Sequence, residues 1–194
     1  MPPANSTMLA LGTPAPEFSL PDYGVDATGD AKTLSDVAGD KATVVAFISN
    51  HCPFVKHLAD QFASLAKSHE GEGVGFVAIG ANNIETHPED GPDHMTVEAK
   101  ARGYTFPYLF DETQDVAKAY RAACTPDFYV FDKDLKLAYR GQFDDSRPDK
   151  GTATGADLKA AIEAIAAGTP APEPQQPSIG CGIKWKPGNQ PDYA

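Results

Sequence analysis

The pattern of hydrophobic positions along the chain predicts a set of buried strands. Three runs are continuously apolar and rich in β-branched or aromatic residues: 43–49 (TVVAFIS), 73–80 (GVGFVAIG) and 128–131 (FYVF). Such runs are typical of strands that are covered on both faces of a sheet. Residues 13–20 instead alternate apolar and polar positions, which predicts a short edge strand or one arm of a hairpin.

Helical spacing appears between these strands. Four large apolar side chains recur at intervals of three or four: Phe54, Leu58, Phe62 and Leu65. This spacing predicts a helix over residues 53–69. A further amphipathic helix is predicted over residues 156–167, where Gly168 ends it. Strands alternating with helices in this order predict an α/β domain with a central mixed β-sheet flanked by helices on both faces.

The chain is expected to hold one domain, residues 1–168, followed by a linker and a tail, residues 169–194. Its 194 residues suit a single domain with some additions. Residues 169–177 (TPAPEPQQP) are proline-rich and predict an extended linker. The segment that follows, SIGCGIKWKPGNQPDYA, carries a cysteine between two glycines, and we expect it to be mobile enough to reach a site elsewhere.

Charge and composition exclude several functions. The chain has 16 basic and 27 acidic residues, a net charge of −11. This balance argues against nucleic acid as a partner, since a phosphate backbone favours clustered Lys and Arg, and against binding to an anionic membrane surface. No stretch is long enough to span a bilayer, and the N-terminus lacks the features of a signal peptide, so the expected location is the cytoplasm.

The cysteines are the strongest candidates for chemistry in this sequence. An odd and small number of cysteines in a reducing compartment argues against a structural disulfide framework; the three are Cys52, Cys124 and Cys181. Cys52 falls where a buried strand ends and a helix begins, and a helix N-terminus stabilises a thiolate there. Pro53 suits the first helical position. The alternative is a small buried apolar residue. A reactive Cys52 should reach solvent and ionise more readily than a free cysteine.

A metal site is not expected. His51 and His57 flank Cys52 and could supply nitrogen ligands, but the chain has no recognised metal-ligand spacing. The loop ETHPEDGPDH, residues 85–94, is interpreted as a solvated acidic insertion. Asn82 and Asn83 follow the strand at 73–80, at the sheet edge expected for Cys52.

The segments around Cys52 and Cys124 resemble a known fold. FISNHCPFVKHLADQFASLAK is similar to the active-site segment of the thioredoxin fold, and CTPDFYVFD resembles the Thr–cis-Pro loop of that fold. The opening GTPAPEFSL is similar to the start of alkyl hydroperoxide reductase/thiol-specific antioxidant (AhpC/TSA) proteins. The resemblance covers residues 12–167 and implies a thioredoxin-like fold with an N-terminal hairpin extension and a C-terminal tail.

The resemblance implies a substrate groove beside Cys52 and also shows departures from the family pattern. A cis peptide at Pro126 would shape the groove, Thr125 would offer backbone groups to an extended substrate, and Pro53, Ser49 and Asn50 would line it. The departures are Val55 in place of a second cysteine, Val45 in place of a peroxiredoxin proline, and Pro126 near the expected position of an active-site arginine. Asp127, beside the groove, is expected to repel acidic partners.

The resemblance therefore implies a thiol-disulfide oxidoreductase with Cys52 as the nucleophile. A distal cysteine, Cys181 or Cys124, would resolve the intermediate. No cofactor is required, because electrons come from other thiols. The expected partners are a thiol or disulfide substrate protein, a small-molecule thiol, or peroxide, and the tail thiol reaches either its own chain or a second copy in a homodimer. The alternatives are a thiol-dependent peroxidase that uses Ser49 and a non-catalytic redox-sensing or binding module.

Overall fold

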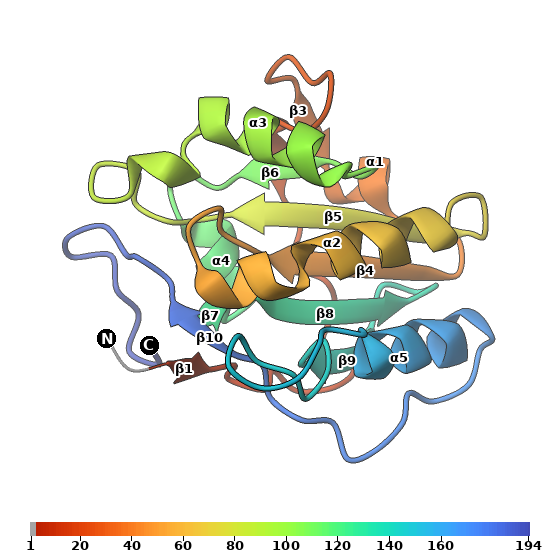
Figure 1. The fold of residues 1–194 in the computed structure, drawn as a ribbon. Coiled ribbons are helices and arrows are strands. Elements are labelled where there is room, and N and C mark those ends of the chain that lie inside the picture. The colour runs from red at the N-terminus through yellow and green to blue at the C-terminus, as the bar shows by residue number, and fades with distance from the viewer. Residues whose placement is uncertain (1–2) are drawn as a thin grey trace.

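A computed structural model describes residues 3–194 and contains a central five-stranded sheet (Figure 1). Its strand order is β6–β5–β4–β8–β9. The bounds are β4 Ala42–Phe47, β5 Val74–Gly80, β6 Tyr108–Phe110, β8 Asp127–Asp132 and β9 Leu137–Gly141. Strands β4, β5 and β6 are parallel, whereas β8 and β9 run antiparallel to their neighbours. The predicted mixed sheet is confirmed.

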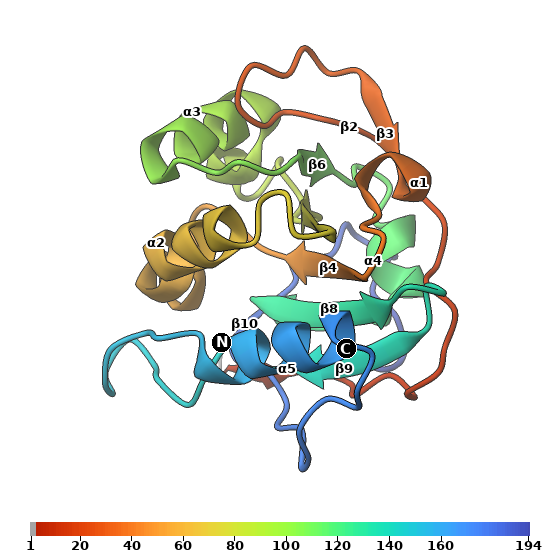
Figure 2. The ribbon, with the colours of Figure 1, turned by 90° about the vertical axis from the view of Figure 1, so that its right-hand side faces the viewer.

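Helices cover both faces of this sheet (Figure 2). Their bounds are α1 Leu34–Val37, α2 Pro53–Ser68, the 3₁₀ helix η1 Pro88–Asp90, α3 Pro92–Arg102, α4 Asp115–Ala119 and α5 Ala156–Ala166. Apolar residues of α2, α3 and α5 share one core cluster, and those of α1 and α4 share the cluster on the opposite face. Within residues 3–194, each helix is too short or too polar to cross a membrane.

Strand β4 shows why its sequence lacks hydrophobic alternation. Val44 and Ala46 face the core beneath α2, whereas Val45 and Phe47 face the core beneath α1 and α4. Both faces of β4 are excluded from water, so every position of the strand is apolar or neutral. Phe62 of α2 packs on this sheet with no more than 1% of its surface exposed, and burying such a side chain stabilises the fold by about 1.5–3 kcal/mol.

Two small sheets lie outside the central sheet, and they include residues from near both ends of the chain. Strands β2 (Ser19–Pro21) and β3 (Ala31–Thr33) pair antiparallel and make the expected N-terminal hairpin extension. Strands β1 (Ala4–Asn5), β10 (Ile179–Gly182) and β7 (Cys124–Thr125) form a three-stranded sheet in the order β1–β10–β7. The C-terminal tail therefore lies beside the N-terminus and against the start of α2 (Figure 1).

This placement corrects the expectation of a freely swinging tail. The Gly-Cys-Gly segment is a strand held between two neighbours. Polar side chains hold the tail beyond it as well, because Lys184 N donates to Asn82 Oδ1 (2.8 Å) and Lys186 N donates to Gln114 Oε1 (2.8 Å). A strand with backbone pairing on both edges has little freedom to move while it is docked.

Candidate active site

The first element of the site is the loop between β4 and α2. Cys52 is the N-cap residue of α2, and Pro53 is at the first helical position, as the sequence predicts. The N–H of the first helical residue has no acceptor within the helix, so a proline at this position loses no hydrogen bond. Strand β4 ends at Phe47, so the intervening residues carry the chain from the sheet edge to the helix start.

The Cys52 thiol is more enclosed than the sequence indicates. Its exposed fraction is 0%, and its Sγ donates to the carbonyl oxygen of Thr125 at 3.1 Å. The side chain makes no cap hydrogen bond to the helix N-terminus. The expectation of a solvent-exposed sulfur is wrong for this conformation, because the Thr125 loop and β10 pack against the start of α2.

The second element is the loop at Pro126. The Thr125–Pro126 peptide bond is cis, as the resemblance implies. The backbone of Thr125 pairs antiparallel with Cys181 of β10, and its carbonyl also accepts from Cys52. The backbone edge expected to hold a substrate strand is thus occupied by the tail of the same chain.

Cys181 pairs with Thr125 on this edge, interacts with the Cys52 side chain and is only partly buried. Burial raises the pKa of the Cys181 thiol to about 12, and its interaction with the Cys52 side chain adds to the rise. A thiol neighbour that resists ionisation can act as a hydrogen-bond donor to a Cys52 thiolate. The two thiols therefore form an interacting pair on this edge.

Cys124 is in a different environment. It is fully buried, and its Sγ donates to the carbonyl oxygen of Pro126 at 3.6 Å. Burial raises the pKa of Cys124 well above its ordinary value, and the charge of Asp127 adds to this effect. The hydrogen bond directs this thiol to its own loop, so a resolving reaction would first have to break that contact.

Asp127 is buried rather than placed on the surface of the groove. Its exposed fraction is 0%, its Oδ2 accepts from Tyr129 OH (3.0 Å), and its Oδ1 has no partner among the described residues. Burial raises the pKa of Asp127 to about 8. A largely protonated acid inside the fold cannot repel acidic partners at the surface, so that expectation is wrong.

A buried carboxylate that sequence reasoning missed organises the Cys52 loop. Asp90 of η1 is 3% exposed. Its Oδ1 accepts from the backbone N–H groups of Asn50 (2.7 Å) and His51 (3.3 Å), and its Oδ2 is 2.6 Å from His51 Nδ1 and 2.8 Å from Asn82 Nδ2. The interpretation of residues 85–94 as a solvated insertion is therefore wrong at this position. In the sequence, Asp90 is one of several acidic residues in this segment, and no pattern distinguishes it from the others.

Ser49 and Asn50 also support the loop. Ser49 Oγ accepts from the backbone N–H of Cys52 at 3.2 Å and lies 3.2 Å from His51 Nδ1. Asn50 donates to Glu89 O (2.9 Å) and accepts from Tyr108 OH (3.0 Å). The contacts of both side chains direct them to the loop and the core, and no hydrogen bond joins Ser49 to the Cys52 sulfur in the described residues.

Imidazole rings gather at the rim of the site. The His51 ring stacks on His87 with 4.6 Å between ring centroids. Partial burial lowers the pKa of His87, and the positive charge of His51 and of Lys184 lowers it further. Repulsion between two cations at this distance disfavours double protonation.

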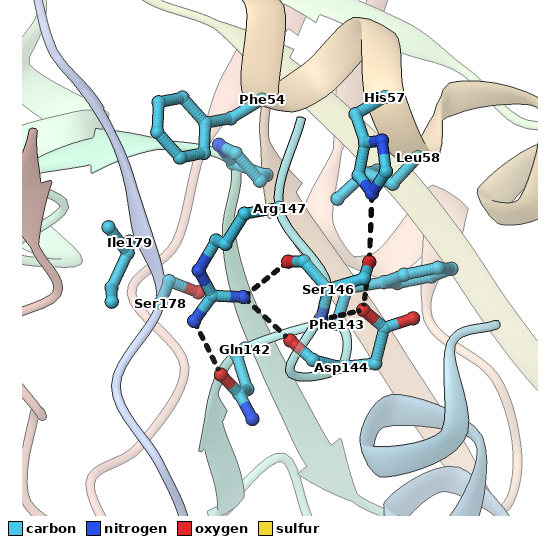
Figure 3. Close-up of a pocket in the computed structure, with 11 residues that line it drawn as sticks. Phe54, His57, Leu58, Gln142, Phe143, Asp144, Ser146, Arg147, Ser178 and Ile179 are labelled. Atoms are coloured by element: carbon cyan, nitrogen blue, oxygen red, sulfur yellow. Dashed lines mark hydrogen bonds between the residues drawn. The ribbon is translucent and has the colours of Figure 1, made fainter. Parts of the chain in front are cut away.

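A small pocket that Pro126 helps to line lies between α2, the loop after β9 and the tail (Figure 3). Phe54 and His57 of α2 and Ser178 and Ile179 of the tail line this pocket. The Arg147 guanidinium in this pocket donates to Gln142 Oε1 (2.9 Å) and to the carbonyl oxygen of Asp144 (2.9 Å). The tail therefore encloses this pocket as well as the Cys52 thiol.

The sheet, the cysteine at the start of α2 and the cis-proline loop define a thioredoxin-fold protein with a single thiol at the helix start. A solved thioredoxin-family thiol:disulfide interchange protein from Chlorobium tepidum has the same fold, with a TM-score of 0.61 at 18% identity over 81% of this chain and 98% of that chain. The AhpC/TSA family model matches residues 11–140. The chain belongs to the AhpC/TSA family.

Two further relatives extend over most of the chain. An uncharacterized conserved protein from Geobacillus kaustophilus is 55% identical, with a TM-score of 0.92 over 96% of this chain and 98% of that chain. The thiol-disulfide oxidoreductase ResA of Geobacillus thermodenitrificans is 27% identical over 161 residues, which cover 82% of this chain and 80% of that protein. The likeness to the first protein includes the C-terminal tail, since only a few per cent of either chain is left uncovered.

Proposed function

We propose that this protein is a thiol-disulfide oxidoreductase in which Cys52 is the nucleophile and Cys181 the resolving thiol. The observation that carries the proposal is the pairing of β10 with β7, which sets Cys181 opposite Thr125, the residue whose carbonyl oxygen contacts Cys52 Sγ. Residues 1–168 would form the thioredoxin-like domain, and residues 169–194 would be the tail that supplies the second thiol.

The chemistry needs no group beyond thiols and a disulfide. The Cys52 thiolate attacks one sulfur of a substrate R–S–S–R, the S–S bond breaks, and one RS⁻ leaves with the electron pair of that bond. The Cys181 thiolate then attacks the Cys52 sulfur of the mixed disulfide and expels the second RS⁻. The two leaving thiolates take up the two protons of the cysteines, so that the substrate gains two electrons. Two molecules of a small thiol in solution would return the Cys52–Cys181 disulfide to the dithiol and would themselves be joined in a disulfide.

The environments of the other two cysteines favour Cys181 over Cys124 for the second step. Cys181 is partly exposed and interacts with the Cys52 side chain, whereas Cys124 is buried and bonded to Pro126 O. Both thiols have a raised pKa, and consumption of the Cys52 thiol removes one cause of the rise at each of them, so partial exposure is what distinguishes Cys181 from Cys124. A resolving thiol that ionises after the first step is suited to its role.

Peptide mapping of the oxidised protein tests this proposal. The reduced protein is treated with glutathione disulfide, quenched in acid and digested without reduction. We expect a Cys52–Cys181 disulfide, a stable Cys52–glutathione adduct in Cys181→Ser, and an unchanged disulfide in Cys124→Ser. Recovery of Cys52 and Cys181 as free thiols after prolonged incubation with excess glutathione disulfide, or a Cys52–Cys124 disulfide, would refute the assignment.

The same protein samples separate the oxidoreductase from a peroxidase. A peroxidase oxidises its cysteine directly with peroxide and needs charge stabilisation for the departing oxygen. Ser49 Oγ contacts the Cys52 backbone, which leaves that role unfilled. We expect slow reaction of Cys52 with hydrogen peroxide, at a rate like that of a free thiol, measured by stopped-flow mixing. A reaction several orders of magnitude faster than a free thiol would favour the peroxidase.

A further inference from the structure

The tail strand occupies the edge of the site that a substrate segment needs. In strand addition, an extended peptide pairs its backbone with an exposed sheet edge. Here β10 pairs with β7 through Cys181 and Thr125, and β1 pairs with the other edge of β10. The edge of β7 beside Pro126 is therefore filled by the chain itself.

Docking of β10 depends on a very close approach at Gly180. A β-carbon added at residue 180 would overlap the carbonyl oxygen and carbon of Thr125 and lie 3.1 Å from Pro126 Cδ. At Gly182, two residues further on, an added β-carbon would meet only Ala4 Cβ at 3.9 Å and Ala123 O at 4.0 Å. Strand β10 thus touches the cis-proline loop at Gly180, which has no side chain. Cys181 is the next residue of the strand.

Access to Cys52 is blocked in this docked arrangement. The thiol has 0% exposed surface and contacts the same Thr125 carbonyl that faces Gly180. An attacking sulfur must approach a disulfide in line with the S–S bond, which needs open space beside it. The docked tail leaves no such space.

We propose that β10 is a self-docked strand that holds the place of a substrate segment, so that a disulfide outside the chain reaches Cys52 only while β10 is undocked. The proposal rests on the proposed function of Cys52 and adds its regulation. Undocking exposes the thiol and removes the neighbouring Cys181. Redocking returns Cys181 to the mixed disulfide and completes the second step described above, with expulsion of RS⁻.

A matched pair of glycine variants tests the gate. Gly180→Ala pushes β10 off the loop and keeps all three cysteines, whereas Gly182→Ala adds the same methyl group to the same strand without a clash. Iodoacetamide modification of Cys52 is followed by residue-resolved mass spectrometry. Since overpacking of this kind is costly, we expect Gly180→Ala to react roughly tenfold faster or more, and Gly182→Ala to react like the wild type. Equal Cys52 rates in all three proteins would overturn the proposal.

Wild-type kinetics provide a second measurement that does not depend on a variant folding. With excess glutathione disulfide or excess insulin, the rate of Cys52 oxidation should saturate at one common limit, the undocking rate. A rate that rises linearly with glutathione disulfide over the whole range would contradict the gate. Failure of the gate leaves the Cys52–Cys181 disulfide intact in peptide maps, whereas failure of the proposed function removes that disulfide itself.

Discussion

The Asp90 carboxylate offers a sharp test of how the site is held together. Asp90→Ala removes a buried acceptor of four hydrogen bonds, two from backbone amides and two from the side chains of His51 and Asn82. The substitution also removes a partner that orients Asn82, whose Oδ1 accepts from Lys184 N of the tail. The change should therefore reduce global stability and loosen the cover over Cys52.

The magnitude follows from the type of bond lost. A hydrogen bond to a charged group contributes about 1.5–3 kcal/mol net, but the partly exposed His51 regains bonds to water. Leaving a buried donor without its acceptor costs about 1–3 kcal/mol. Asp90→Ala does this to two backbone amides and to the Asn82 side chain, so we expect a total loss of about 3–5 kcal/mol. Asp90→Asn keeps an oxygen for the backbone amides and should lose roughly half as much.

Urea unfolding of the reduced protein, followed by far-UV circular dichroism, measures these losses. Glu89→Ala is the matched control, since Glu89 is the adjacent acid of the same 3₁₀ helix, its side chain is exposed, and only its backbone oxygen contacts Asn50. It should change the free energy of unfolding by no more than about 0.5 kcal/mol. Equal effects of Asp90→Ala and Glu89→Ala would refute the organising role of Asp90.

Three other predictions concern the cysteines and the buried acid. A Cys52–Cys181 disulfide closes a loop of about 130 residues, so the oxidised protein should be more stable than the reduced one by up to about 5 kcal/mol in urea unfolding; equal midpoints would contradict it. Because interaction with Cys52 contributes to the raised pKa of Cys181, Cys52→Ser should shift the pH profile of Cys181 alkylation to lower pH, and an unchanged profile would exclude the contact. The raised pKa of Asp127, about 8, means that the unfolded chain binds fewer protons between about pH 4 and 8. Wild-type stability should thus fall with rising pH in this window, and Asp127→Asn should gain about 3 kcal/mol relative to wild type between pH 4.5 and 7.5; parallel pH profiles would refute the burial argument.

Local sequence was sufficient for the elements that position Cys52. The apolar run of β4 requires burial on both faces, and the spacing from Phe54 to Leu65 fits a single face of α2. Pro53 marks the first turn because its ring fits there and nowhere inside a helix. These features follow from contacts between near neighbours in the chain, so periodicity and propensity were enough to predict them.

Long-range contacts decided the state of the site. The sequence determined that a cysteine heads a helix and that a second cysteine lies between glycines in a tail. Only the tertiary structure decided that the tail strand docks on Thr125, that Asp90 binds the backbone of Asn50 and His51 before Cys52, and that Cys52 is enclosed. Such contacts join residues that are tens of positions apart, and their free energy depends on burial and geometry that a local pattern does not encode.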